Sequence, residues 1–350
     1  MSVFAAFILA AHSLGVDPAL AQNAVAPPTA APAYRELKDE AGRTVRIPQP
    51  VRRIVSLAPS ITETLYALGL QDRLVGDTDY CDYPPDAQKK TKVGGTINPS
   101  IEEIVALKPD LVLMAKSSNR LETVLALDNL GIPSYATDPQ NVEQIVSSTE
   151  NLAAILGAPE AGTLLAVQLR RQLAELQHHI EGVTPRRVLF VVWTEPLISI
   201  GKHTFIADAL LHAGAVSIVE VEEGWPKTSL EEVIHQQPEF LVFAESHSGA
   251  AQEDRDKLAA LPGWRSLDAL KNHRVAVISD AVNRPAPRII SAIEELAEQL
   301  HPEAFIAKPK IEKEPQEKHE DRTPHSADAS RLTAPYPAAN PPREGVSCAH

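Results

Sequence analysis

Apolar residues along this chain follow two spacings in turn, and the alternation predicts strands and helices in succession. Short continuous apolar runs are typical of strands buried in a parallel sheet, and apolar residues three and four positions apart are typical of helices that cover such a sheet. After a predicted β-hairpin at 34–50, the predicted strands are 53–57, 75–77, 111–114, 133–136, 188–193, 240–244 and 275–278. The predicted helices are 61–68, one capped by Ser100, 122–130, 142–156, 205–213, 230–235 and 288–300. This order predicts an α/β fold with mostly parallel sheets covered on both faces.

One stretch of this pattern occurs twice. Residues 100–113 read SIEEIVALKPDLVL, and residues 229–242 read SLEEVIHQQPEFLV. Each copy follows, at a similar distance, a predicted strand that begins with an arginine, Arg53 in one half and Arg187 in the other. Two copies of one α/β unit predict two similar lobes, and a cleft between lobes is where a small ligand usually binds.

A long helix is predicted between the two copies, over residues 159–182. Pro159 suits a first helical position and Gly182 suits a stop. One face of this helix is apolar and carries Leu165, Leu169, Leu173, Leu176 and Ile180. A helix of about 24 residues is roughly 36 Å long, and it would connect the lobes stiffly, so we expect small opening and closing motions.

The ends of the chain differ from its middle. Residues 1–21 are a predicted signal peptide, because an apolar run is followed by a small-residue cleavage site at Ala19-Leu20-Ala21. That run has no Lys or Arg before it, and the alternative is an unstructured apolar tail. No later run reaches the roughly 20 apolar residues of a membrane span, so we expect a periplasmic protein with a cleaved signal peptide. The parts that follow are an Ala/Pro linker at 22–33, an N-terminal lobe at 34–157, a linking helix at 158–182, a C-terminal lobe at 183–306 and a charged, Pro-rich tail at 307–350 that is predicted to be disordered.

Composition excludes several classes of function. The net charge of −13 disfavours nucleic acid and anionic membranes, both of which attract basic surfaces. Two cysteines, Cys81 and Cys348, do not support a disulfide framework. No histidine lies between His12 and His178, which disfavours a zinc or manganese receptor, and two methionines exclude a Met-rich copper site. No nucleophile elbow, phosphate-binding loop or dinucleotide motif is present, so we expect no enzyme activity.

Four stretches carry a resemblance to a known family. RIVSLAPSITETLYALG, DYPP, SIEEIVALKPDLVL and APRI occur in that order. Over about residues 36–300 the chain resembles the solute-binding proteins of ABC importers that have a rigid linking helix, the receptors for iron-siderophores, haem and cobalamin. The loop at 80–85 and PLISIGK at 196–202 look most like the cobalamin-binding branch. The resemblance implies two lobes joined by one long helix, a ligand groove between them, a monomer, and no cofactor beyond a metal carried by the ligand.

The resemblance also implies contact with a permease dimer in the membrane. Members of this family present one glutamate from each lobe to arginines of the permease, and the matching residues are Glu102 and Glu231. The sequence agrees, because both follow a predicted serine cap in equivalent copies and would lie symmetrically on one rim. The alternative is that acids in a first turn favour the helix dipole, which Glu103 and Glu232 would serve equally.

Six positions match the groove residues of the cobalamin branch, namely Tyr80, Thr96, Ile198, Trp225, Asp280 and Arg284. Cobalamin is a large ring with apolar faces and amide arms, so its groove needs aromatic surfaces with a few donors and acceptors. Trp225, in a Gly-Trp-Pro loop, would be such a surface, and Asp280 and Arg284 would accept from and donate to the arms. Thr96 stands where some relatives have a tryptophan, so one wall of the groove is less aromatic.

Each of these assignments has a competing interpretation. Tyr80 could pack within its loop, and Asp280 with Arg284 could form a local ion pair that shapes theirs. Packing is the favoured interpretation for Tyr83 and for Trp264, whereas Trp193 stays open.

Three functions follow in order of preference. The first is a receptor that delivers cobalamin or a related corrinoid to an importer. The second is a receptor for haem or a ferric siderophore, in which haem would need a ligand such as Tyr80. The third is an exported hydrolase, for which the sequence offers neither a serine nucleophile nor a metal centre.

Overall fold

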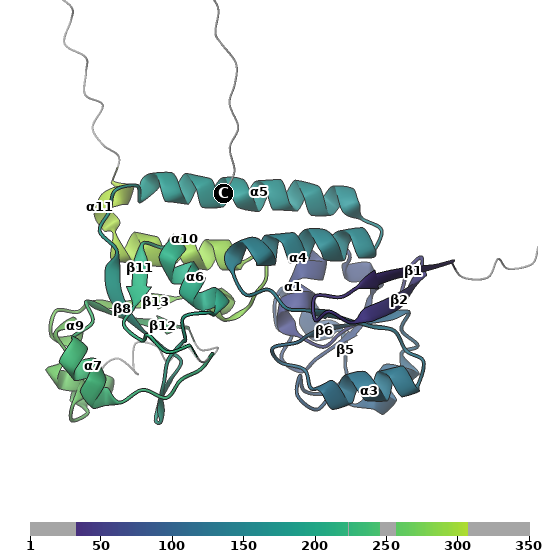
Figure 1. Cartoon of the computed structure of the whole chain (residues 1–350), viewed down its shortest axis with the longest axis horizontal. Helices are drawn as coiled ribbons and strands as arrows, with labels where there is room; N and C mark the ends of the chain where they lie inside the picture. Colours follow the sequence, from purple (N-terminus) through teal and green to yellow (C-terminus); the bar gives the residue numbers. More distant parts are fainter. Residues whose placement is uncertain (1–32, 223, 246–256, 307–350) are drawn as a thin grey trace, which may run out of the picture. The chain divides into compact units, whose positions relative to one another are not determined.

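The computed structural model describes residues 33–222, 224–245 and 257–306 (Figure 1). The predicted signal peptide, the linker up to residue 32 and the predicted C-terminal tail lie outside the described residues. Within the described part of the chain, no helix is long and apolar enough to span a membrane.

The strands are short, as expected for buried parallel sheets. They are β1 (Ala33–Lys38), β2 (Thr44–Gln49), β3 (Ile54–Ser56), β4 (Leu74–Asp77), β5 (Thr91–Lys92), β6 (Leu111–Ala115), β7 (Ser134–Thr137), β8 (Arg186–Val191), β9 (Trp193–Thr194), β10 (Leu197–Ile198), β11 (Ala215–Ser217), β12 (Phe240–Ala244) and β13 (Val275–Ile278).

The helices between them cover the sheets. They are α1 (Pro59–Ala67), α2 (Ile101–Ala106), α3 (Leu121–Asn129), α4 (Val142–Ile155), α5 (Pro159–His179), α6 (Phe205–His212), α7 (Leu230–Gln236), α9 (Asp268–Lys271), α10 (Ile289–Leu300) and α11 (Pro302–Phe305). Short 3₁₀ turns are η2 (Gln71–Arg73), η3 (Pro85–Lys89), η4 (Trp264–Ser266) and η5 (Asp280–Asn283).

Two separate parallel sheets form the two lobes, which confirms the predicted fold class. The N-lobe sheet has the order β5-β4-β3-β6-β7, and the C-lobe sheet has the order β11-β8-β12-β13. Every strand pair within both sheets is parallel. In each lobe the second strand pairs with one side of the first strand, and two later strands follow in order on its other side, which gives β4-β3-β6-β7 and β11-β8-β12-β13. The N-lobe sheet has one more strand, β5, which pairs with β4 at the edge. The repeated sequence therefore corresponds to a repeated topology.

The same backbone contacts recur at the repeated segments. In the N lobe, Arg53 donates from its side chain to Leu107 O at 2.7 Å, and Asp110 accepts from Arg53 N at 2.8 Å. In the C lobe, the side chain of Arg187 donates to Gln236 O at 3.1 Å, and Glu239 accepts from Arg187 N at 3.1 Å. Each arginine thus binds carbonyl groups at the end of α2 or α7, which have no partner within their own helix.

One expected cap is wrong. The sequence predicts that Ser60 caps the first helix with Glu63 three residues later, but α1 begins two residues earlier than predicted, at Pro59, and Ala58 is its N-cap. Proline suits the first turn because it has no N–H to satisfy. Ser60 lies inside the helix, where its carbonyl accepts from the hydroxyl of Thr64 at 2.8 Å. The side chain of Glu63 is therefore left for another role.

Apolar side chains on both faces of each sheet form the cores. In the N lobe, α1 and α4 pack on one face and α2 and α3 on the other. In the C lobe, α6 and α10 pack on one face, and α7 and α9 on the other. Helices α2 and α7 therefore occupy equivalent faces of the two lobes.

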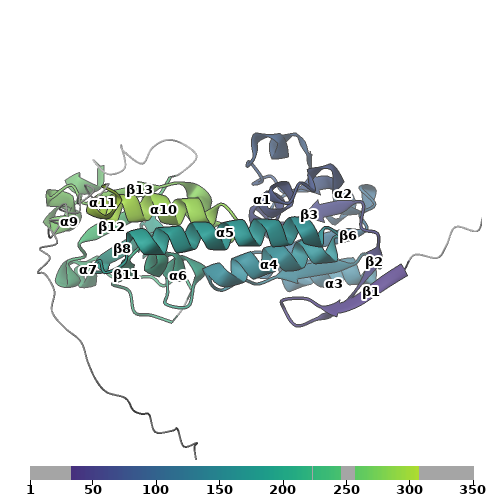
Figure 2. The ribbon, with the colours of Figure 1, turned by 90° about the horizontal axis from the view of Figure 1, so that it is seen from above.

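The linking helix is α5, which ends at His179 and is three residues shorter than predicted. Three of the five predicted apolar positions, Leu169, Leu173 and Leu176, are buried, and Leu165 and Ile180 pack partly against the core. Helix α5 runs along α4 (Figure 2). Gly162 permits their close approach, because a Cβ atom there would lie 2.5 Å from Cβ of Ala153.

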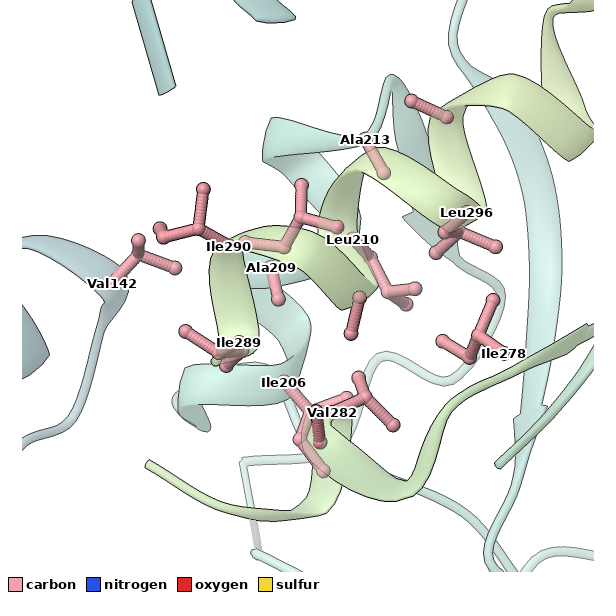
Figure 3. Close-up of a cluster of buried hydrophobic side chains, with 14 of the residues drawn as sticks. Val142, Ile206, Ala209, Leu210, Ala213, Ile278, Val282, Ile289, Ile290 and Leu296 are labelled. Atoms are coloured by element: carbon pink, nitrogen blue, oxygen red, sulfur yellow. The ribbon is translucent and has the colours of Figure 1, made fainter. Parts of the chain in front are cut away.

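Helix α4 contributes to the cores of both lobes. Its first half places Val142, Ile145 and Val146 in the core formed by α5, α6 and α10. Figure 3 shows Val142 beside Ile290 of α10. Its second half places Leu152 and Ile155 in the N-lobe core. The junction between the lobes is therefore a shared apolar core in addition to the covalent link through α5.

Candidate functional site

A cavity of about 400 Å³ opens at the carboxyl ends of the C-lobe strands, where α/β sheets usually bind ligands. We call it the Trp225 cavity, and its lining residues are Phe190, Val191, Val192, Trp225, Ala244, Glu245, Asp280, Asn283 and Arg284. Strands β8 and β12 supply one wall, and η5 after β13 supplies Asp280 and Asn283. Three of the six predicted groove residues, Trp225, Asp280 and Arg284, thus line one cavity.

Trp225 presents a large apolar surface at this cavity. Its side chain is 53% exposed, although tryptophan is usually well covered in a folded protein. The loop that carries it is held by Ser199 N, which donates to Pro226 O at 3.1 Å. An exposed indole on a held loop beside polar groups is typical of a ligand-binding surface.

Arg284 is the centre of a network of charged side chains that joins the lobes. Its guanidinium contacts Glu63 at 2.6 Å, Asp82 at 2.7 Å and Asp280 at 3.0 Å. Arg288 also contacts Glu63, at 2.9 Å, and Asp280, at 3.4 Å. We call these five residues the Arg284 network. The predicted local pair between Asp280 and Arg284 exists, but it is one part of a larger set.

Burial affects the charge of this network. Burial lowers the pKa of Arg284, but hydrogen bonds to Asp82 and Glu63 outweigh it, and the net shift is upward. Burial likewise lowers the pKa of Arg288, and the hydrogen bond to Glu63 more than reverses it. Both guanidinium groups therefore remain charged at any physiological pH.

The N-lobe candidates lie on two neighbouring segments. Tyr80 is 62% exposed in the loop after β4. Asp79 N donates to Gly94 O at 3.0 Å, and a Cβ atom on Gly95 would lie 3.6 Å from the Tyr80 ring. Thr96, half-buried, accepts at its carbonyl from the amide of Asn119 at 2.7 Å. Tyr80 and Thr96 are thus close together, but neither lines the Trp225 cavity.

Lys92 holds the loop that carries Tyr80. Its ammonium group donates to the carbonyls of Thr78, Cys81 and Ala87 at 3.1–3.2 Å and to Oδ1 of Asp77 at 2.8 Å. The carboxyl of Asp77 is fully buried, and its Oδ2 has no partner within the described residues. Burial raises the pKa of Asp77 to about 6, and the contact with Lys92 only partly opposes this.

Replacing Asp77 by asparagine should flatten the pH dependence of stability. Because the folded-state pKa is raised from 3.8 to about 6, Asp77 stabilises the fold fully below pH 3.8, and that contribution is lost as the pH rises through 6. Asp77→Asn should therefore remove up to about 3 kcal/mol of the fall in unfolding free energy between pH 4 and pH 7. Urea unfolding at both pH values measures this. Asp79→Asn is the control, because the carboxyl of Asp79 is exposed to water. If Asp77→Asn has the same difference in unfolding free energy between the two pH values as the wild type, the expectation is wrong.

The remaining candidates are more peripheral. Ile198 is half-buried in the hairpin of β9 and β10, where it pairs with Trp193, which is 61% exposed. Trp264 is buried in the core with α7 and α9, which confirms the predicted packing role. Tyr83 packs under Arg288, whose guanidinium carbon lies 3.8 Å from the ring centroid. Ile198 does not line the Trp225 cavity.

Glu102 and Glu231 occupy equivalent positions in the first turns of α2 and α7. Both side chains are exposed. Ser100 caps α2 by accepting from Glu103 N at 3.2 Å, and Ser229 caps α7 by accepting from Glu231 N at 3.1 Å. The predicted caps are confirmed, whereas contact with a permease stays a prediction.

Sequence reasoning did not identify Glu63, Asp82, Arg288 and Glu245 as site residues. One signal was available for Glu63, because it is the only charged residue among the nine of α1. A lone charge in an otherwise uncharged, buried helix needs a partner elsewhere in the fold. Within the described residues, no group of three or more His, Cys, Asp or Glu side chains is arranged to hold a metal ion. The thiol of Cys81 is free and buried, and burial raises its pKa.

Comparison with models of known protein families shows to which family the chain belongs. The family model described as periplasmic binding protein matches residues 54–282, which include both sheets and the linking helix. The chain belongs to the periplasmic binding protein family. Proteins of this family are binding proteins rather than enzymes.

Similar members of the periplasmic binding protein family differ in what they bind. An uncharacterised ABC transporter substrate-binding lipoprotein of Bacillus subtilis is 31% identical over 277 residues, covering 77% of this chain and 86% of the relative. The periplasmic vitamin B12 binding protein of Vibrio cholerae superposes with a TM-score of 0.62 at 29% identity, over 72% of this chain and 97% of that one. A periplasmic haem-binding protein from Roseiflexus sp. RS-1 has a TM-score of 0.65 at 26% identity, over 73% and 99%.

Proposed function

We propose that this protein is the exported solute-binding component of an ABC importer, and that it captures cobalamin or a related corrinoid and delivers it to the membrane permease. Family membership and the Bacillus subtilis relative support the transport role. The Vibrio cholerae vitamin B12 binding protein supports the ligand class. The site geometry supports it further.

The observation that carries the proposal is an exposed indole next to carboxylates in one cavity. Trp225 offers an apolar face, and Asp280 and Glu245 offer acceptors on the lining of the same cavity. A corrin ring has broad apolar faces and a periphery of uncharged amide arms. The indole would cover a face, and the carboxylates would accept hydrogen bonds from amide N–H groups.

The cavity takes only part of such a ligand. Its volume of about 400 Å³ is at the small end for ligand pockets, and a corrin ring with its arms is larger. The rest of the ring would extend toward the exposed phenol of Tyr80 and toward Thr96. Both lobes would then contribute to binding, as expected for a groove at the ends of two sheets.

Haem, or a ferric siderophore, is the second candidate. The Roseiflexus protein supports haem, and the exposed phenol of Tyr80 favours it, since tyrosine can ligate haem iron. Haem, however, carries two propionates, and the Trp225 cavity would present Glu245 and Asp280 to them. Like charges brought together away from water are unfavourable, so we place the corrinoid first. An exported hydrolase has no support from family membership and is not proposed.

Titration of the purified protein tests the ligand class. Cobinamide, cobalamin and haem are each added while tryptophan fluorescence and ligand absorption are recorded. We expect saturable quenching by the corrinoids and weaker binding of haem. Tight haem binding without a corrinoid response would replace the proposal with the second candidate.

Charge reversal tests delivery to the permease. Glu102→Arg combined with Glu231→Arg should slow association with the permease by about tenfold or more, because facing charges steer encounter and set register. Corrinoid affinity should not change. Glu103→Arg with Glu232→Arg is the matched control, since it changes the same charge in the same two helical turns. Surface binding kinetics on permease in nanodiscs measure both, and equal slowing by the two pairs would contradict docking through Glu102 and Glu231.

A further inference from the structure

Glu63 is a buried carboxylate of the N lobe whose side chain accepts hydrogen bonds from two arginines of the C lobe. Its side chain is 3% exposed. Oε1 accepts from Arg284 at 2.6 Å and from Arg288 at 3.0 Å, and Oε2 accepts from Arg288 at 2.9 Å. Buried charges are retained only when they are paired in this way. The carboxylate of Glu63 therefore links the N lobe to two guanidinium groups of the C lobe.

Arg284 connects Glu63 to the Trp225 cavity. It lines that cavity, and its side chain is only 12% exposed. Arg288 does not line the cavity, but it contacts Asp280, which does. Glu63 itself does not line the cavity, but it contacts Arg284, which does.

The Arg284 network carries an excess of negative charge because of Glu63. Three carboxylates, those of Glu63, Asp82 and Asp280, face two guanidinium groups. Glu245, which is exposed and lines the same cavity, adds another negative charge. Without Glu63 the two remaining carboxylates would balance the two arginines. The guanidinium groups cannot adjust the balance themselves, since they stay protonated.

From this geometry we infer that Glu63 is a specificity-determining residue of the groove, which acts through Arg284 and Arg288 to disfavour anionic ligands. The inference rests on the proposed corrinoid function. Arginine at a ligand site would ordinarily attract carboxylates, often with two parallel hydrogen bonds. Glu63 accepts hydrogen bonds from the guanidinium N–H groups that would otherwise bind a ligand carboxylate. The cavity is therefore selective for uncharged amides.

A pair of ligands that differ in charge tests this role. Cobinamide has uncharged amide arms, and cobyrinic acid has the same ring with carboxylates in their place. The ratio of their dissociation constants is measured for the wild type, Glu63→Gln and Arg288→Gln. Glu63→Gln preserves the shape of the side chain and removes its charge. Glu103→Gln is the control, because it changes the net charge of the protein equally at an exposed site on α2.

The two variants should move the ratio in opposite directions. Glu63→Gln should favour cobyrinic acid over cobinamide by about tenfold relative to the wild type, from a charge acting over several ångströms at intermediate dielectric. Arg288→Gln should disfavour cobyrinic acid by a similar factor. A purely structural role would weaken both ligands together and leave the ratio unchanged.

The outcomes separate the inference from the function on which it rests. If the wild type binds no cobinamide, the proposed function fails and the inference fails with it. If cobinamide binds but the ratio in Glu63→Gln equals that in Glu103→Gln, only the inference is wrong. Should circular dichroism show that Glu63→Gln is unfolded, the ratio in Arg288→Gln decides alone.

Discussion

Replacement of Arg284 by methionine should lower the free energy of unfolding by about 3 kcal/mol. Arg284 is nearly buried and contacts Glu63, Asp82 and Asp280. Removing it leaves these carboxylates facing one another with Arg288 as the remaining cation of the network. Breaking a buried ion pair on one side is costly because the charge left behind has lost its hydration without keeping its partner. The lobes would also lose the hydrogen bonds from Arg284 to Glu63 and Asp82, and Arg288 would remain as the link to Glu63.

Urea unfolding followed by circular dichroism measures this loss. Arg170→Met is the matched control, since Arg170 also contacts two carboxylates, those of Glu143 and Glu150, but is 40% exposed. Exposed pairs of this kind contribute about 0–1 kcal/mol. Equal losses in the two variants would mean that the Arg284 network stabilises the fold no more than a surface pair does.

Replacement of Trp225 by alanine should weaken corrinoid binding by about 30- to 100-fold, which corresponds to roughly 2–3 kcal/mol. Trp225 has the largest apolar side chain among the residues that line the cavity, and it is 53% exposed before a ligand covers it. Covering apolar area of this kind is the main favourable contribution that an aromatic side chain makes to binding. Stability should change less than for a fully buried tryptophan, because about half of the Trp225 surface is already exposed in the folded protein.

Calorimetric titration of Trp225→Ala with cobinamide measures the change. Trp193→Ala is the control, because Trp193 is similarly exposed, at 61%, but lies in the hairpin outside the cavity lining. Its indole N–H already donates to Glu195 O at 2.8 Å. If Trp193→Ala loses more cobinamide affinity than Trp225→Ala does, the aromatic surface that binds the ligand is Trp193 in the hairpin and the assignment of Trp225 is wrong.

The fold was predictable where local pattern and burial agree. Strands 240–244 and 275–278 match β12 and β13 at both ends, since each is a continuous apolar run in a parallel sheet. The serine caps of α2 and α7 were readable because a side-chain oxygen three residues before a free N–H is a local signal. The short strands β9, β10 and β11 were missed, because two or three residues carry no period.

The site was predictable only in part, because its central feature joins residues far apart in the chain. Asp280 and Arg284 are four residues apart, and the local pair between them could be expected from spacing. Glu63 lies more than 200 positions before Arg284, and no periodicity connects them. Ser60 followed by Glu63 has the local pattern of a capping box, which would place the Glu63 side chain at the start of α1. In the fold, that side chain instead accepts from Arg284 and Arg288 of the other lobe.

The division of α4 between two cores has a consequence for the history and the handling of this protein. The sequence repeat and the order shared by four strands of each sheet are typical of a duplicated unit. A cut between α4 and α5 would now leave Val142 and Ile145 without cover in one fragment and would remove part of the core of the other. The halves have become mutually dependent, so isolated fragments would be expected to aggregate, and mixing both fragments would be needed to restore a soluble molecule.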